Sequence, residues 1–371
     1  MKINTKRYIM PALASCILYS SFSHAEDIEP VTFKQAYEAY QTALEGKDRQ
    51  AVVNKAEQAY LLGKNVYKND FSNQAALVSN FASAVANTAQ SHKKISQEKK
   101  QAYDLYQQAL SLYKKAYPSE PVQLIEPYLN LSRVASNRSI SKKHLNQAFE
   151  IANDTNDELL IAQTKYAAFN LLKQSPYYSK KVRNYALNAL EVYQEKLPEN
   201  SVERIQASYS VAKIRLASQK YNQAEALFLE VIKQLETLDY SHPYELASHA
   251  MLVELYERRK NSDASTKHCI AIGKMKPWND SQEQIPIFRM SPQYPMTAVK
   301  QGKSGFVTMS FAINESGIVT NPKIIDSKGG KGFEKASLKA LKKWRFAPKF
   351  ENGKAVKAED LKVTLDFSIS S

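Results

Sequence analysis

The side chains best able to do acid–base, nucleophilic or metal chemistry in this sequence are six histidines and two cysteines. Only His268 and Cys269 are adjacent, and neighbouring helix positions point about 100° apart, so these two side chains do not converge. No His-Glu-x-x-His, Walker A or Gly-x-Ser-x-Gly motif is present. We therefore expect a protein that is not an enzyme and holds neither a metal nor a cofactor. We interpret Cys269 as a buried thiol at a helix contact.

The composition limits the class of protein further. A chain of 371 residues is long enough for two or three domains. The hydrophobic fraction of 43% excludes wholesale disorder, and two cysteines exclude a disulfide framework. Lysine and arginine number 51 against 37 acidic residues, and the net charge of +14 favours acidic partners or surfaces. No motif indicates a small-molecule substrate, and the secretory signal described next argues against nucleic acid.

Residues 1–25 have the pattern of a signal peptide. A basic start is followed by a mostly apolar run from Tyr8 to Phe22, and Ser23-His24-Ala25 resembles a cleavage site. The run is too short to span a bilayer comfortably, so we expect cleavage and a periplasmic protein. Two alternatives stay open. Cys16 follows a lipobox-like Leu-Ala-Ser and could carry a lipid, and a retained segment could anchor the chain in the inner membrane.

Residues 26–275 show the periodicity of stacked helices. Apolar residues recur every three or four positions, without glycine-rich turns or sustained alternation. Similar segments recur at an offset of 122 positions, as from Ala102 to Ala224, which divides into three units of about 40 residues. The unit at 207–235 resembles a tetratricopeptide repeat in five small, aromatic or apolar positions: Ala212, Tyr221, Ala224, Phe228 and Val231. We predict a curved all-α solenoid suited to binding, with an unrelated antiparallel helical array as the alternative.

The pattern changes after a polar linker, which we place at 276–284. From residue 285 onward, alternation of period two predicts strands, and one segment has the period of a helix. The expected elements are strands at 306–313, 318–327 and 361–369, and a helix at 333–344. A hairpin turn at Asn314–Gly317 joins the first two strands. The order β-β-α-β predicts a small antiparallel sheet with a helix on one face, so the whole chain is an α+β multidomain protein.

Residues 285–371 resemble the C-terminal domain of the TonB family. The matching features occur in order at family-like spacings: Gln293-Tyr294-Pro295, the Gly302–Gly305 step, the Gly317 hairpin, Ser327 before a glycine-rich stretch, Trp344-Arg345-Phe346-Ala347-Pro348, Gly353, and the last strand to Phe367. From the residues alone, we expect Trp344 and Phe346 to pack in the core, and Pro348 to stop the helix.

The resemblance implies a function and a site. A TonB C-terminal domain binds the TonB box of an outer-membrane receptor, and the extended peptide would add as a strand beside the last strand of this chain. Carried over by position, the peptide-binding residues are Gln293, Tyr294, Pro295, Leu361, Val363, Leu365 and Phe367. The implied role is energy transducer or accessory in TonB-dependent transport, such as siderophore or iron uptake.

Two features of TonB transducers are missing from the pattern. Neither a long Pro-rich arm nor a clear membrane anchor is visible, and a helical solenoid stands in place of the arm. We therefore expect the solenoid to hold a partner, either an ExbB/ExbD-type inner-membrane motor or another envelope protein. The alternative function is an envelope scaffold whose C-terminal domain docks on another envelope protein.

Overall fold

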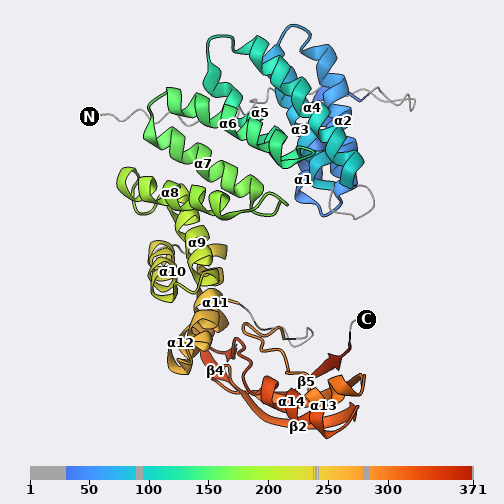
Figure 1. The fold of residues 1–371 in the computed structure, drawn as a ribbon, viewed down its shortest axis with the longest axis vertical. Coiled ribbons are helices and arrows are strands. Elements are labelled where there is room, and N and C mark those ends of the chain that lie inside the picture. Colours follow the sequence, from blue (N-terminus) through green and yellow to red (C-terminus); the bar gives the residue numbers. More distant parts are fainter. Residues whose placement is uncertain are drawn as a thin grey trace, which may run out of the picture.

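The computed structural model of the chain describes residues 31–88, 95–236, 242–276 and 284–369, with the single residues 238, 240 and 278. A long helical array is followed by a small domain of sheet and helix, and together they curve into an open C (Figure 1). The signal peptide predicted at 1–25 lies outside the described residues. Among the described helices, none is long and apolar enough to cross a membrane.

Short helices in sequence order build the array. Within the described residues they are α1 (Phe33–Glu45), α2 (Arg49–Val66), α3 (Phe71–Thr88), α4 (Ile95–Ala116), the 3-10 helix η1 (Pro121–Leu124), α5 (Ile125–Val134), α6 (Arg138–Asp154), α7 (Glu158–Leu172), α8 (Lys180–Lys196), α9 (Val202–Ala217), α10 (Tyr221–Leu235), α11 (Pro243–Arg258) and α12 (Ser262–Met275). Polar caps fix several starts. Thr32 forms a capping box with Gln35, and Asp157 and Ser201 accept hydrogen bonds from the first turns of α7 and α9.

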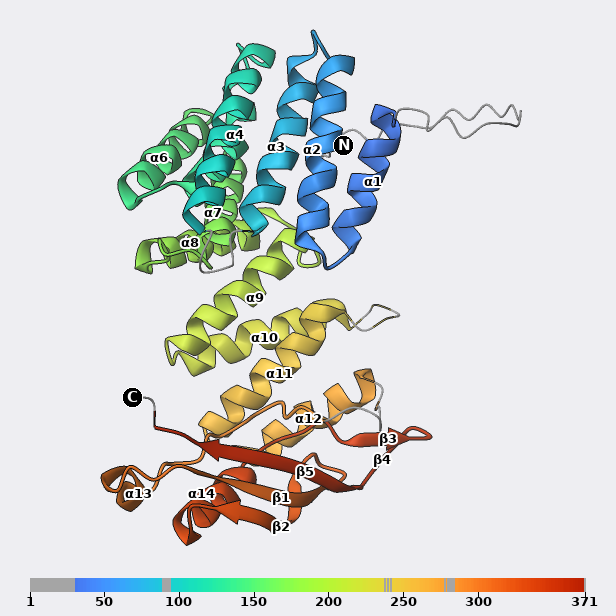
Figure 2. The same ribbon diagram turned by 90° about the vertical axis from the view of Figure 1, so that its right-hand side faces the viewer.

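Consecutive helices pack as pairs, and the pairs stack on one another (Figure 2). Small residues bring the two helices of a pair together, since Ala212 on α9 and Ala224 on α10 are fully buried. Phe228 is also fully buried at this contact, and Tyr221 packs against the same cluster. Val231 is fully buried in a neighbouring cluster with Ile205 of α9. The helical-repeat packing predicted for these five residues is therefore the packing observed.

The C-terminal domain contains a three-stranded antiparallel sheet in the order β2-β1-β5. Its elements are α13 (Met296–Lys300), β1 (Gly305–Ile313), β2 (Val319–Lys328), α14 (Lys331–Leu341), β3 (Lys349–Glu351), β4 (Lys354–Val356) and β5 (Ala358–Phe367). One face of the sheet buries Val307, Met309 and Ile313 against Phe333 and Leu341 of α14. This is the predicted β-β-α-β order, with an additional short β3–β4 hairpin before the last strand.

The helix of this domain ends three residues earlier than its periodicity predicts. After Leu341 the chain turns, and the backbone of Arg345 forms bridges to Phe288 and Ile318. The pairing of Arg345 removes this segment from the helix, although Trp344 remains buried as expected. The last strand likewise ends at Phe367 rather than at residue 369.

The helical array and the C-terminal domain meet at a well-packed junction on α11 and α12. Arg345 donates through Nε to Oε1 of Glu257 on α11 at 2.5 Å, and both side chains are almost fully buried. On α12, Gly273 lies so close to Pro348 that an added Cβ would come within 2.7 Å of its carbonyl oxygen. Cys269 is buried at the same junction. The C-terminal domain is therefore held by the last helix pair. The domain borders at 276–284 stay a prediction.

Candidate functional site

The two edges of the sheet differ in regularity. β1 is central, so β2 and β5 each have one outer edge. Opposite β1, the pairing of β2 shifts twice, and near one shift Asn321 has a φ of +50° and is followed by Pro322, which has no N–H. β5 has one bulge at its start, where Asp360 has a φ of +58°. From Leu361 to Phe367, β5 pairs residue for residue with β1.

The regular part of β5 therefore presents an open row of backbone donors and acceptors. In the described part of the chain, no strand or isolated bridge pairs with its outer edge. Such an edge is a template for a further strand, whereas bulges and proline are the usual means by which an edge is protected from pairing. The geometry thus favours β5 over β2 as the edge that accepts an extended peptide.

The predicted residues of β5 share one face of the sheet. Leu365 and Phe367 are buried in the domain core, whereas Leu361 and Val363 are only half-buried. The alternating residues Lys362, Thr364 and Asp366 are exposed on the other face. A peptide added at this edge would therefore meet apolar side chains on one face and polar side chains on the other.

The Gln293-Tyr294-Pro295 segment lies at the C-terminal end of β5. The Tyr294 ring packs edge-on against Phe367 at 5.5 Å and against Phe333 at 5.4 Å between centroids. Its hydroxyl donates to the carbonyl oxygen of Lys303 at 2.5 Å. Gln293 is exposed and Pro295 is half-buried. The structure thus brings the two predicted parts of the site together through Tyr294 and Phe367.

The residues just before Gln293 are held by contacts with Trp344. The indole N–H of Trp344 donates to the carbonyl oxygen of Met290 at 2.9 Å, and the Arg289 guanidinium lies 4.9 Å from the Trp344 ring centroid. Trp344 and Phe346 are both at most 2% exposed. They pack in the core, as the sequence predicts, and Trp344 holds the segment that leads to Tyr294.

The β3–β4 hairpin was not predicted from the sequence, although the Asn352-Gly353 pair that marks its turn was present. Asn352 and Gly353 both have positive φ, at +49° and +76°, between two short strands. An Asn-Gly pair between strand residues is the strongest short-range sign of a two-residue hairpin. The junction pair Arg345–Glu257 was also missed, because no local pattern links residues 88 positions apart.

Two of the histidines, His249 and His268, form a pair that was not predicted from the sequence. Nδ1 of His249 on α11 lies 2.7 Å from Nδ1 of His268 on α12, and the Tyr256 ring stacks on His268. Burial lowers the pKa of His249 and of His268 to about 4, so both rings are neutral at pH 7. Burial raises the pKa of the Cys269 thiol to about 12, which makes it unreactive. Within the described residues, no group of three His, Cys, Asp or Glu could hold a metal ion.

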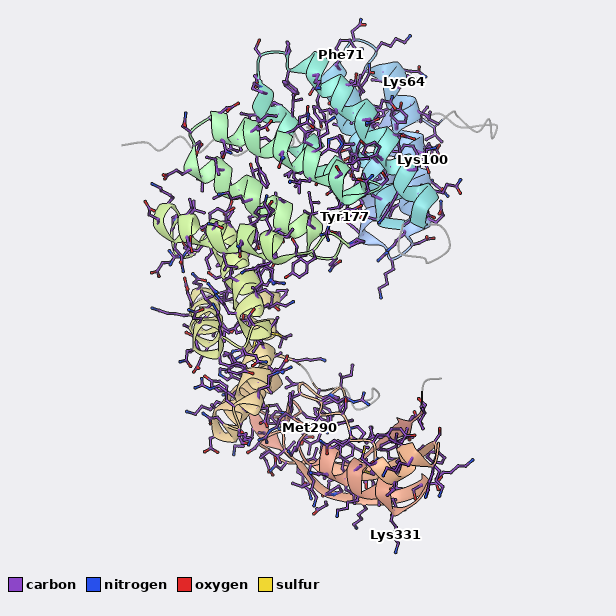
Figure 3. All side chains as sticks on the ribbon, viewed as in Figure 1. Lys64, Phe71, Lys100, Tyr177, Met290 and Lys331 are labelled. Atoms are coloured by element: carbon purple, nitrogen blue, oxygen red, sulfur yellow. The ribbon has the colours of Figure 1, made fainter. Side chains whose placement is uncertain are left out.

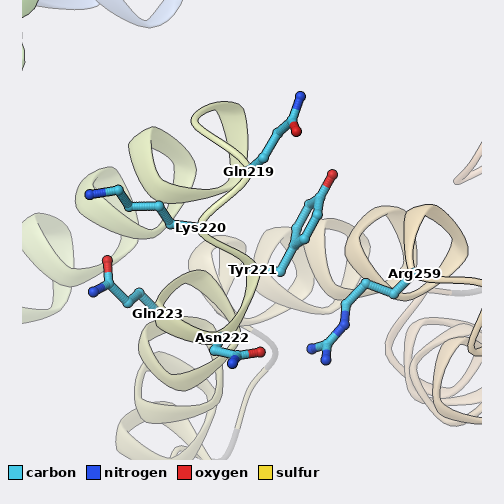
Figure 4. A pocket seen from close by; sticks show the side chains of 6 residues that line it. All are labelled: Gln219, Lys220, Tyr221, Asn222, Gln223 and Arg259. Atoms are coloured by element: carbon cyan, nitrogen blue, oxygen red, sulfur yellow. The ribbon is translucent and has the colours of Figure 1, made fainter.

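An open hollow lies where α9 turns into α10 (Figure 4). Its lining is polar: Gln219, Lys220, Tyr221, Asn222, Gln223 and Arg259. Arg259 already pairs with Glu225 at 2.8 Å. The hollow is open to solvent, unlike the enclosed clefts that bury most of the surface of a small molecule.

Comparison with known proteins agrees with this division of the chain. Residues 290–369 match the family model described as Gram-negative bacterial TonB protein C-terminal. The C-terminal domain is a TonB-type domain. Over 81 residues the chain is 33% identical to Protein TonB of Yersinia enterocolitica, covering 22% of this chain and 29% of that protein. The chain thus spans less than a third of the curated relatives it matches.

Different solved structures resemble the C-terminal domain and the helical array. The TonB-type domain is 34% identical to the TonB2 protein of Vibrio anguillarum, covering 26% of this chain and 91% of that chain, with a TM-score of 0.21. The helical array resembles BtubC (BKLC) from P. vanneervenii at 13% identity, covering 65% of this chain and 99% of that chain, with a TM-score of 0.50. At that identity the second likeness concerns the fold alone. It agrees with the all-α helical array of residues 33–275.

Proposed function

We propose that this protein works in TonB-dependent transport across the outer membrane, as an energy transducer or an accessory, and that its TonB-type domain captures a receptor's TonB box by strand addition at β5. The observation that carries the proposal is the regular edge of β5 from Leu361 to Phe367, which pairs with no further strand of the described chain, whereas β2 at the other edge is interrupted. The match of residues 290–369 to the TonB family supports the choice of partner. Gln293, Tyr294 and Pro295 flank the C-terminal end of this edge.

The solenoid has a separate role in this proposal. The solenoid holds a partner, either an ExbB/ExbD-type inner-membrane motor or another envelope protein, while the TonB-type domain engages the receptor. The buried Arg345–Glu257 pair supports this division, because it fixes the domain to the last helices of the solenoid. We further propose a periplasmic location with a cleaved signal peptide, iron or siderophore uptake as the process served, and no catalytic activity. Intact-mass analysis of the mature protein, expected to begin at Glu26, tests the location.

Two matched lysines test which edge binds the peptide. Lys362 on β5 and Lys323 on β2 both pair with Ser310 of β1, on opposite sides. Lys362→Cys and Lys323→Cys therefore place a thiol at the same height on the two edges, and the native Cys269 is buried. We expect a TonB-box peptide with a terminal cysteine to form a disulfide with the β5 variant and not with the β2 variant. Equal yields at both edges, or none at either, would contradict strand addition at β5.

A second function rests on the same junction. If the domain, fixed by α11 and α12, only docks the solenoid on an envelope protein, the molecule is a scaffold rather than a part of transport. A photo-reactive residue at position 362 distinguishes the two in cells. Cross-links to TonB-dependent receptors support transport, and cross-links only to other envelope proteins support the scaffold.

A further inference from the structure

The exposed side of α14 carries a cluster of lysines without acidic partners. Lys331, Lys335 and Lys339 follow one another at four-residue spacing, and Lys342 and Lys343 come directly after the helix. All five are exposed, and none forms an ion pair with a carboxylate of the described chain. We call these five residues the lysine face. Mutual repulsion among like charges at this spacing is unfavourable, so the face gains from an anionic partner.

The one acidic residue of α14 is already engaged. Glu334 accepts a hydrogen bond from the Ser327 hydroxyl at 2.7 Å and is only half-exposed. It therefore offers little compensation to the lysine face, which acts as a concentrated positive surface.

Exposed apolar side chains lie beside the lysine face. On α13, Met296 is 69% exposed and Val299 is 43% exposed. The start of α13 adjoins the start of α14, since a side chain at Gly332 would come within 3.3 Å of the Pro295 ring. Exposed lysines flank this apolar tip on both sides: Lys300, Lys303 and Lys331. Apolar side chains beside a basic helix face form the arrangement with which proteins bind a membrane interface.

The position of this surface leaves the peptide edge free. In the sheet, β5 lies toward the solenoid and β2 lies farthest from it, with β1 between them (Figure 2). Lys331 points away from the helical array at the outer end of the domain (Figure 3). A flat surface that contacts the domain at Lys331 would therefore lie away from the outer edge of β5 (Figure 2, Figure 3).

We propose that the lysine face and the α13 tip rest on an anionic lipid surface, with the ammonium groups over phosphate headgroups and Met296 and Val299 inserted at the interface. The positive charge of the lysine face favours an anionic partner. The exposed Met296 and Val299 favour lipid over a soluble polyanion, because a soluble polyanion offers these side chains no apolar environment. The inference goes beyond peptide capture and does not depend on it.

Sedimentation of the full chain with vesicles of phosphatidylglycerol and phosphatidylcholine tests the proposal. We expect binding at 0.1 M salt that weakens toward 1 M, because the screening length falls from about 10 to about 3 Å. Each lysine near an anionic bilayer changes the binding constant about fivefold. The triple variant Lys335→Glu, Lys339→Glu, Lys342→Glu should therefore bind at least about 100-fold more weakly. Met296→Ser should bind about tenfold more weakly.

A control variant with the same change in net charge distinguishes an effect of the lysine face from an effect of the net charge of the protein. Lys142→Glu, Lys143→Glu, Lys180→Glu alters three exposed lysines of the solenoid by the same total charge and should bind vesicles like the parent. Equal loss in both triple variants would overturn the proposal, as would no binding by the parent. An unchanged Met296→Ser variant would also overturn it, by assigning the lysine face to a soluble polyanion. Disulfide capture of the peptide at position 362 by the lysine-face variant reports separately on β5.

Discussion

The junction between the solenoid and the TonB-type domain contains a buried ion pair. Arg345 is 7% exposed and Glu257 is 11% exposed, and they meet at 2.5 Å. Removing one partner of a buried pair leaves the other charge desolvated and unpaired, at a cost of about 3–5 kcal/mol. Because neither side chain is completely buried, we expect Glu257→Ala to lower the free energy of unfolding of this part of the chain by about 3 kcal/mol.

An exposed pair on the same helix provides the control. Glu254 and Arg258 meet at 2.7 Å, but their side chains are 31% and 53% exposed. Glu254→Ala should therefore cost less than about 1 kcal/mol. Urea unfolding followed by tryptophan fluorescence suits the comparison, because Trp278 packs against the core of the TonB-type domain. With a urea dependence of about 2 kcal/mol per molar, Glu257→Ala should lower the midpoint by about 1.5 M.

A double variant tests the stated cause. If the cost comes from the unpaired guanidinium, Glu257→Leu combined with Arg345→Met should recover most of the stability lost in Glu257→Ala, since an apolar pair carries no desolvation penalty. A midpoint for Glu257→Ala no lower than that of the Glu254→Ala control would refute the reasoning. So would a double variant that is less stable than Glu257→Ala.

Three further predictions concern the same helices. Cys269, with its pKa raised to about 12 by burial, should react with maleimide at pH 7 only after unfolding, and rapid labelling of the native chain would contradict its burial. Gly273→Ala should lower the free energy of unfolding by about 1–3 kcal/mol in thermal unfolding, because the new Cβ would lie 2.7 Å from the Pro348 carbonyl oxygen. A rise of about 1 kcal/mol, which is usual for Gly→Ala in a helix, would contradict this prediction by showing that the neighbouring backbone moves to make room. The folded-state pKa values of His249 and His268 are lowered from 6.5 to about 4, so the unfolded chain binds more protons between these values. The free energy of unfolding should therefore fall by about 2–3 kcal/mol for each histidine from pH 7 to pH 4, and His268→Leu should reduce that pH dependence by about half in unfolding measured across the range.

The periodicity of the sequence was sufficient for most of the elements and their faces, but it did not reveal the β3–β4 hairpin. The alternation at 361–367 placed Leu361, Val363, Leu365 and Phe367 on one side of a strand, and the structure agrees. Likewise, Ala212, Ala224 and Phe228 have the burial that a helix–helix contact requires. Local rules suffice here, because helix and strand spacing fix which side chains share a face. The resemblance carried over Gln293, Tyr294 and Pro295, which the structure brings to the end of β5.

The way in which distant segments meet could be learned only from the folded structure. In the folded chain β1 lies at the centre of the sheet, which leaves β5 at an edge. The pairing of β2 is interrupted by bulges that the spacing of residues in the sequence did not predict. The fold also brings Arg345 to Glu257, and pairs two histidines on neighbouring helices. Such contacts depend on the stacking angles of whole helices and on long-range strand pairing. Because those quantities arise from the packing of many residues at once, local sequence patterns were enough for most of the helices and strands, whereas the surfaces that stay open depend on the whole fold.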